Sequence, residues 1–372
     1  MSTNINMQNL VTAEQMASIL ERAVKNVVEN PGLSRSLPPM IIRGPAGVGK
    51  STIVKDLANR LGIGFVDIRL AQMERVDVAG LPSVENGTTK WNVPNIWPRD
   101  PDSKGIIFLD EITAAPADVQ VAAYSIILDR MIPNSDYRIP DGWYIVAAGN
   151  RVKDRAVAKP MSSALANRFA HFEIDVDPEQ WGAWAICHDV HPSVTGFIKY
   201  RPMNLFKTDG QNLEQGWPSP RSWERVSNVV KLFAGDSNLS KIVAGLIGDQ
   251  VACEFMAFHK LNSKFDSVLE MLTNPKAKIV IPERADERYA MASAVSYLVW
   301  NGKDEDDIKN RIGGMYRITM EMSSDFSTMV IKNAMLGNSK ISNADATLMI
   351  ARHESYPEWK AKFGHFNTRA RK

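Results

Sequence analysis

A glycine-rich segment that ends in a lysine and two hydroxyl residues lies at residues 44–52 and has the pattern G-x-x-x-x-G-K-[ST]. This pattern is typical of a phosphate-binding loop, because glycines let successive backbone N–H groups converge on a phosphate without a Cβ in the way. Lys50 would place an ammonium group against the β- and γ-phosphates, and the Ser51 hydroxyl would ligate Mg²⁺. The residues predicted to bind the nucleotide are Gly44, Pro45, Ala46, Gly47, Val48, Gly49, Lys50, Ser51 and Thr52.

Two carboxylates and an amide follow two other apolar runs. The run at 105–109 ends in Asp110 and Glu111, and the run at 145–149 ends in Asn150. Buried parallel strands deliver ligand-binding groups at their carboxyl ends. Asp110 would hold Mg²⁺, Glu111 would polarise the attacking water, and Asn150 would orient that water beside the γ-phosphate. Solvated acids at a strand end and an Asn in a turn are the alternatives.

Two arginines stand at well-defined places. Arg168 lies at a predicted helix end, and Arg221 lies at the start of a helix that Pro220 initiates. One chain needs only one such charge on its own nucleotide, so the second suggests delivery from a neighbouring copy. Surface ion pairs are the alternative for both arginines, and they are the favoured explanation for Arg130, Arg151 and Arg155.

The elements that must position these groups alternate in type. A leading helix is expected at 12–28 and another at 51–61, and strands are expected at 40–43, 65–70, 105–109, 143–148 and 172–176. Apolar strands that alternate with helices predict an α/β fold with a parallel five-stranded sheet flanked by helices. Segments 77–101 and 131–142 interrupt this order and read as hairpins, the first because of its Asn86-Gly87 signal.

The remainder of the chain is expected to be helical. We predict three parts: a nucleotide-binding core at 1–177, an all-α lid at 178–262 and a C-terminal helical extension at 263–372. With 372 residues, 44% of them hydrophobic, the chain is long enough for two or three domains.

The composition excludes some partners. A net charge of +2 gives no global field that would attract nucleic acid or a membrane. The two cysteines make no metal-binding spacing, and free thiols fit a reducing compartment. The N-terminus has no leader pattern, and no apolar stretch is long enough to cross a bilayer, so a cytoplasmic protein is expected.

In order, the segments GPAGVGKST, GIIFLDE, AAGN, ALANRF and SPRSWE resemble the MoxR-like branch of the AAA+ ATPases, and the resemblance runs from about residue 11 to about residue 260. It implies Walker A at 44–52, Walker B at Asp110 and Glu111, sensor 1 at Asn150, an arginine finger at Arg168 and sensor 2 at Arg221. It also implies a helix-2 insert at 77–101 and a pre-sensor-1 hairpin at 131–142. The C-terminal segment resembles nothing that we can name.

The same resemblance implies ATP and Mg²⁺ as cofactors, a homo-oligomeric ring that is commonly a hexamer, a von Willebrand A-type protein partner and a chaperone-like role. The favoured function is therefore a ring-forming ATPase that converts ATP and water to ADP and phosphate and remodels a protein partner.

Two other classes stay open. A nucleic-acid motor would need a basic insert, but 77–101 is close to neutral. A small-molecule kinase with a P-loop would not need Asn150, Arg168 and Arg221.

Overall fold

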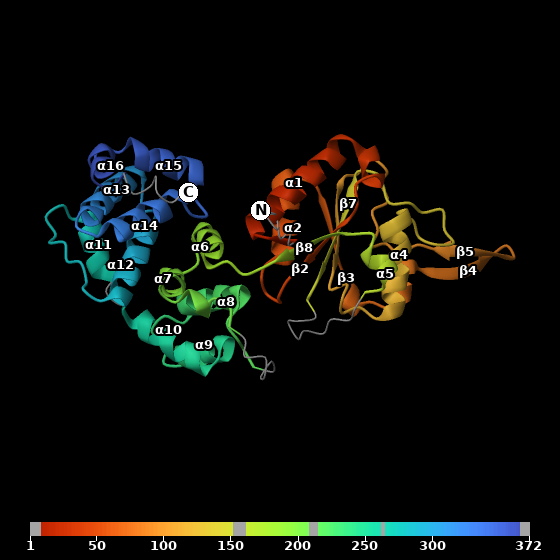
Figure 1. Cartoon of the computed structure of the whole chain (residues 1–372), viewed down its shortest axis with the longest axis horizontal. Coiled ribbons are helices and arrows are strands. Elements are labelled where there is room, and N and C mark those ends of the chain that lie inside the picture. Colours follow the sequence, from red (N-terminus) through yellow and green to blue (C-terminus); the bar gives the residue numbers. More distant parts are fainter. Residues whose placement is uncertain (1–8, 152–160, 208–214, 262–264, 365–372) are drawn as a thin grey trace, which may run out of the picture. The chain divides into compact units, whose positions relative to one another are not determined.

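The computed structural model describes residues 9–151, 161–207, 215–261 and 265–364. The chain divides into two compact units, Met1–Val176 and Asp177–Lys372. The first unit contains a parallel β-sheet with helices, and the described residues of the second unit form helices joined by loops (Figure 1). Each unit is described by itself below.

The sheet of the first unit has six parallel strands, because a short strand joins the five that the sequence predicts. Their spatial order is β1 (Leu10–Val11), β8 (Ala170–Ile174), β2 (Met40–Arg43), β7 (Trp143–Gly149), β6 (Gly105–Asp110) and β3 (Gly64–Arg69). β8 begins and ends two residues earlier than the strand that the sequence predicts at 172–176. The chain leaves β2 toward β3 and later crosses to β8 on the other side of β2, which creates a crevice at the carboxyl end of β2.

Side chains of the central strands alternate between two apolar layers. Ile42, Phe108 and Val146 face α1 (Ala13–Glu29) and α2 (Lys50–Leu61). On the other face, residues such as Ile41, Leu109 and Ala147 pack against α3 (Arg75–Ala79) and α4 (Ala117–Asp129). Both faces are buried, which is why the strands read as continuous apolar runs in the sequence.

The two interruptions behave differently. β4 (Leu81–Glu85) and β5 (Thr88–Asn92) form an antiparallel hairpin that projects from the first unit (Figure 1). Asn86 and Gly87 both have positive φ, at 53° and 76°, as a two-residue type I′ turn requires. In 131–142 the described pairing is an isolated antiparallel bridge between Met131 and Arg138, and the structure assigns no strands there.

The second unit packs its helices around aromatic side chains. Phe197 of α7 (Pro192–Tyr200), Trp223 of α8 (Pro220–Leu232) and Phe255 of α10 (Asp249–Leu261) have ring centroids 5.5 Å apart in each pair. The α7 and α12 helices are in contact, so helices from both predicted segments, 178–262 and 263–372, lie in one compact unit. The boundary predicted near residue 262 stays a prediction. The helices are α6 (Pro178–Cys187), α7 (Pro192–Tyr200), α8 (Pro220–Leu232), α9 (Leu239–Ile247), α10 (Asp249–Leu261), α11 (Phe265–Thr273), α12 (Ala285–Leu298), α13 (Glu305–Met320), α14 (Ser324–Met335), α15 (Asn343–Arg352) and α16 (Tyr356–Phe363).

Among the described helices, none combines the length and the apolar character needed to cross a membrane.

Candidate nucleotide-binding site

The predicted phosphate-binding loop connects β2 to the first turn of α2. Gly47 and Gly49 have φ values of 79° and 91°, a backbone conformation that side chains with a Cβ rarely adopt. A Cβ on Gly44 would lie 2.7 Å from the carbonyl oxygen of Ile174, so the loop passes too close to β8 for a larger residue. The glycines are therefore required by the path of the loop, which directs the N-terminus of α2 toward the crevice.

Lys50 is buried and turns its ammonium group back into the loop. Its Nζ donates to the carbonyl oxygens of Gly44 and Pro45, both at 2.9 Å, and to Oδ1 of Asn150 at 3.1 Å. The lysine of the loop and the amide at the end of β7 thus meet at one point. This point is where a γ-phosphate would accept hydrogen bonds from both side chains.

The two predicted Mg²⁺ ligands are also in contact. Ser51 Oγ donates to Asp110 Oδ2 at 2.8 Å, which joins the start of α2 to the end of β6. The other carboxylate oxygen, Oδ1, accepts the backbone N–H of Glu111 at 2.8 Å. Hydroxyl and carboxylate oxygens are ligands that Mg²⁺ accepts alongside water and phosphate oxygens.

Glu111 has a left-handed backbone conformation, with φ of 57°. A non-glycine residue in this region costs on the order of 1 kcal/mol or more, and such residues cluster at functional sites. The turn is held on both sides, because Glu111 O accepts the N–H groups of Ala114 and Ala115 and the next residue, Ile112, donates to Ala148 O at 3.0 Å. The strained turn ends β6 and fixes the direction of the main chain at Glu111.

Thr113 is a site residue that the sequence analysis missed. Its buried Oγ1 accepts the N–H of Asn150 at 3.0 Å and donates to Asn150 O at 3.4 Å. A Cβ on Gly149 would lie 2.6 Å from the Thr113 methyl group, so the two chain segments are packed tightly. Thr113 therefore positions Asn150. The sequence signal is only its place two residues after Glu111, which no motif rule singles out.

A further carboxylate lies beside this cluster. Burial raises the pKa of Asp67 on β3, the opposite charge of Arg69 works against the rise, and the charge of Asp110 adds to it. Asp110 pairs across the strands with Arg69, two residues after Asp67.

The residues fit a Mg²⁺–nucleotide complex. Tight glycine turns, a buried lysine and a contacting Ser51–Asp110 pair occur at the same end of the sheet. In the described ranges, no group of three or more His, Cys, Asp or Glu side chains could hold a metal by itself. Mg²⁺ binds through one or two carboxylates together with substrate phosphates and water, and Asp110 with Ser51 would supply the protein ligands.

Arg168 lies near the amino ends of the sheet strands, whereas the phosphate-binding loop lies at their carboxyl ends. It follows α5 (Ser163–Ala166) and comes two residues before β8, whose first residue donates to Pro39 O at 2.9 Å, at the amino end of β2. The guanidinium lies 4.2 Å from the ring centroid of Tyr124 and donates to Ala164 O. The four residues of β2 place about 13 Å of strand between its amino end and the phosphate-binding loop. The structure therefore does not bring Arg168 together with Lys50 and Asp110.

Arg221 belongs to the second unit. It is exposed at the first turn of α8, where Ser219 caps the helix by accepting the N–H of Ser222 at 3.2 Å. Trp223 is fully buried and anchors the helix by donating to Asn204 O at 2.8 Å. Arg221 is thus exposed on a capped and anchored helix, and it makes no ion pair with the residues that the structure describes.

The favoured explanation for Arg130 is wrong. Its guanidinium is buried, and it donates to the carbonyl oxygens of Pro140 and Trp143 at 3.0 and 2.8 Å. Burial lowers its pKa, so an isolated surface ion pair does not describe this side chain. Arg151 lies 3.7 Å from Glu173, as an ion pair requires, and Arg155 lies outside the described residues.

Part of the first unit matches a known family. Residues 39–169 match the family model described as AAA domain (dynein-related subfamily). The match includes the loop at Gly44, the carboxylates at the end of β6, Asn150 and Arg168. The expected α/β fold with a parallel sheet flanked by helices is confirmed, and residues 39–169 are those in which it matches an AAA domain. No curated protein matches the chain.

Among solved structures, three similar chains have low identity. Thermotoga maritima RuvB, a Holliday junction branch migration motor, has a TM-score of 0.35 at 18% identity over 68% of this chain and 76% of that one. A protein from Cytophaga hutchinsonii described as a candidate ATPase has a TM-score of 0.33 at 16% identity over 81% and 80%. NtrX from Brucella abortus, in complex with ADP, has a TM-score of 0.36 at 15% identity over 82% and 65%.

Proposed function

We propose that the AAA domain of this chain hydrolyses ATP to ADP and phosphate in a ring of identical copies, and that hydrolysis remodels a protein partner. The observation that carries the ATPase activity is the convergence of Lys50, Ser51, Asp110 and Asn150 at the carboxyl end of the sheet. When bound, Mg²⁺ would neutralise negative charge on the phosphates. Ser51 and Asp110 would hold it.

The protein side chains divide the remaining work. Glu111 accepts a proton from the attacking water, and Asn150 keeps that water in line, with its own position fixed by Thr113. Lys50 exchanges its carbonyl partners for phosphate oxygens. Arg221 has the role of a cationic sensor for the phosphates in this proposal, as the resemblance suggests.

Assembly is supported by the place of Arg168. A residue near the amino ends of the strands is well placed to contact a nucleotide that a neighbouring copy binds at the carboxyl ends of its own strands. An arginine delivered in this way contributes about 10³–10⁵ in rate to related phosphoryl transfers. We propose a ring, with a hexamer as the size that the MoxR resemblance favours.

The nature of the partner is supported by the β4–β5 hairpin. Val84 and Leu81 are 78% and 56% exposed, and the hairpin's Glu85 and Lys90 neutralise each other in an ion pair of 3.0 Å. Exposed apolar side chains suit contact with a protein, whereas tracking a nucleic-acid backbone requires basic residues. We therefore favour a polypeptide client over a nucleic-acid motor. A von Willebrand A-type partner and a cytoplasmic location complete the proposal.

The first experiment measures ATPase activity per chain across a dilution series, with and without DNA or RNA. We expect activity that requires Mg²⁺, falls steeply on dilution and is unchanged by nucleic acid. Constant activity per chain at all concentrations would indicate a monomeric enzyme such as a small-molecule kinase. Stimulation by nucleic acid would favour the motor.

The second experiment addresses the client. Glu111→Gln should retain a bound partner in the ATP state, and replacing Val84 and Leu81 by Ser in that background should release it. Retention that does not depend on these two side chains would exclude the hairpin as the contact.

A further inference from the structure

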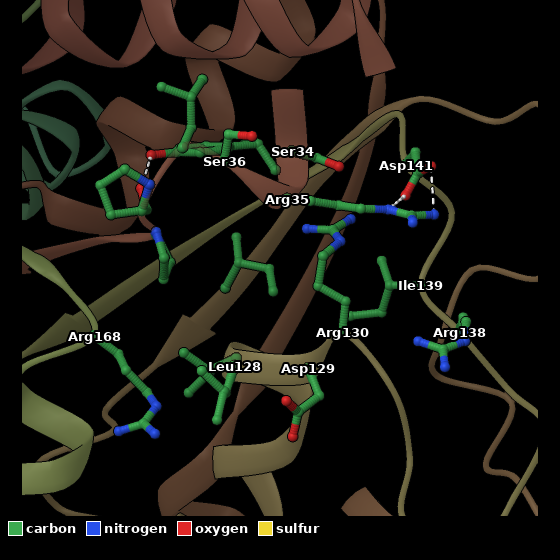
Figure 2. Close-up of a pocket in the computed structure, with 16 residues that line it drawn as sticks. Ser34, Arg35, Ser36, Leu128, Asp129, Arg130, Arg138, Ile139, Asp141 and Arg168 are labelled. Atoms are coloured by element: carbon green, nitrogen blue, oxygen red, sulfur yellow. Dashed lines mark hydrogen bonds and ion pairs between the residues drawn. The ribbon is translucent and has the colours of Figure 1, made fainter. Parts of the chain in front are cut away.

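A cavity lies near the amino ends of the sheet strands, away from the phosphate-binding loop. It has a volume of about 310 Å³ and is lined by residues 34–39, the end of α4, the 138–145 segment and Arg168 (Figure 2). Tyr144 and Ile145, near the start of β7, contribute to its wall. The cavity is formed entirely by the first unit.

Positive charge exceeds negative charge among the lining residues. Four arginines line the cavity, Arg35, Arg130, Arg138 and Arg168, against two carboxylates, Asp129 and Asp141. The difference of four and two leaves an excess of two positive charges. Figure 2 shows Arg35 held by Asp141, and the two hydrogen bonds of this pair measure 3.0 and 2.9 Å.

Several donors at the cavity have unused capacity. Ser34 Oγ, Arg130 Nε and Arg168 Nε are buried and have no hydrogen-bond partner among the described residues. Ser34 and Arg130 are 5% and 8% exposed. A buried polar group left without a partner costs about 1–3 kcal/mol, so three of them around one cavity indicate a missing acceptor.

The electrostatic environment of Arg130 also favours an anion in the cavity. Burial lowers its pKa, the carboxylate of Asp141 opposes this, and the nearby charge of Arg35 reinforces it. Two guanidinium groups close together, with Asp141 already bound to one of them, are stabilised by an anion.

We propose that this cavity binds a phosphate-type dianion, with the arginines and Ser34 as its donors. A phosphate group carries about two negative charges at pH 7 and accepts hydrogen bonds from guanidinium forks and hydroxyls. It would match the excess of two positive charges and supply acceptors for the unused donors. The volume leaves room for ordered water or for a small organic group that carries the phosphate. This site is separate from the P-loop and does not depend on ATP hydrolysis.

The test uses inorganic phosphate and the full-length Lys50→Ala chain, in which the P-loop lacks its phosphate-binding lysine. Phosphate titration is followed by calorimetry and by ³¹P NMR line width, at a chain concentration low enough to prevent assembly. We expect binding to persist in Lys50→Ala, and to weaken at least about tenfold when Arg138→Ala or Arg168→Ala is added. Arg22→Ala, an exposed arginine on α1 outside the cavity, should leave it unchanged.

Ser34→Ala provides a variant with little risk to folding. Because it removes an unpartnered hydroxyl, it should weaken phosphate binding while the free chain unfolds at the same or a higher temperature. Binding that is lost in Lys50→Ala alone, or that ignores both Ser34→Ala and Arg138→Ala, would overturn the proposal. Since no arm contains ATP, failure of the proposed ATPase function would not affect this outcome.

Discussion

Glu111 combines a carboxylate with a left-handed backbone conformation at the end of β6. Glu111→Gln keeps the size of the side chain and the strained turn but removes the proton acceptor. We expect ATP binding to be retained and the turnover rate to fall about 10²–10⁴-fold, the range for losing a general base. Nucleotide affinity and single-turnover hydrolysis measure the two effects separately. Ordinary hydrolysis by this variant would remove Glu111 from the mechanism.

Thr113 acts through Asn150, so its test must separate positioning from folding. Thr113→Val preserves shape but removes both hydrogen bonds to the Asn150 backbone. We expect kcat to fall about tenfold, the equivalent of about 1.4 kcal/mol, with little change in KM for ATP. Thr113→Ser retains the hydroxyl and should recover most of the activity. A Ser variant as impaired as the Val variant would indicate that the methyl group matters and the hydrogen bonds do not.

At the residue scale, the sequence predicts the groups that chemistry fixes by type and spacing. Lys50, Ser51, Asp110 and Asn150 are identifiable because each follows an apolar run or a glycine loop, and the structure brings them into contact. Thr113 and Arg130 are different. Their positions depend on which backbone groups lie opposite after folding, namely Asn150 for one and Pro140 for the other. That information is tertiary and leaves no local pattern.

At the scale of elements, the sequence predicts strands that are buried on both faces, but it does not predict very short strands. β2 has the bounds that its apolar run predicts. β1 has only two residues, too few for a pattern that could be recognised in the sequence. It forms because β8 pairs with it, as the hydrogen bond from Glu173 N to Asn9 O at 2.7 Å shows. The Asn86-Gly87 turn was predicted from its dipeptide, whereas the proline-rich 131–142 segment lacks the alternation that would extend its single bridge into strands.

The α7 helix carries a pH-sensitive cap. His191 Nδ1 accepts the N–H of Ser193 at 3.2 Å, and the His191 ring lies edge-on to His259 with centroids 5.8 Å apart. Burial lowers the pKa of His191 to about 3, and the charges of His259 and Lys231 add to this. An unfolded histidine titrates near 6.5, so below that pH the unfolded chain gains a proton that the folded helix cap refuses.

The second unit should therefore lose stability between about pH 6.5 and pH 3, by about 1.4 kcal/mol for each pH unit. Urea unfolding followed by tryptophan fluorescence at pH 7.5 and pH 5 measures the loss, which should be about 2 kcal/mol from this group. His191→Asn retains a capping acceptor and should remove that part of the pH dependence. His188→Asn, an exposed histidine at the end of α6, serves as the matched control. Equal pH dependence in the parent and in His191→Asn would contradict this assignment.

At the scale of the whole molecule, Lys50 lies at the carboxyl ends of the sheet strands and Arg168 lies near their amino ends. If they serve the same nucleotide, they come from different copies. Lys50→Ala chains and Arg168→Ala chains should each be inactive, and a mixture under assembly conditions should regain part of the activity. The mixture contains sites that combine an intact P-loop with an intact arginine. A mixture without rescue, in assemblies shown to contain both variants, would count against shared sites.

The separation of Arg168 from the phosphate-binding loop also decides how many nucleotide pockets in an assembly can be complete. A chain that gives its arginine from one surface and receives a neighbour's arginine at another associates head to tail, and such an assembly either closes into a ring or continues as a filament. In an open row of n copies, one pocket always lacks its arginine, so only (n − 1)/n of the pockets can work. Closure of the ring supplies the arginine that the last pocket lacks. A ring that loses one copy becomes an open row and again has one pocket without its arginine.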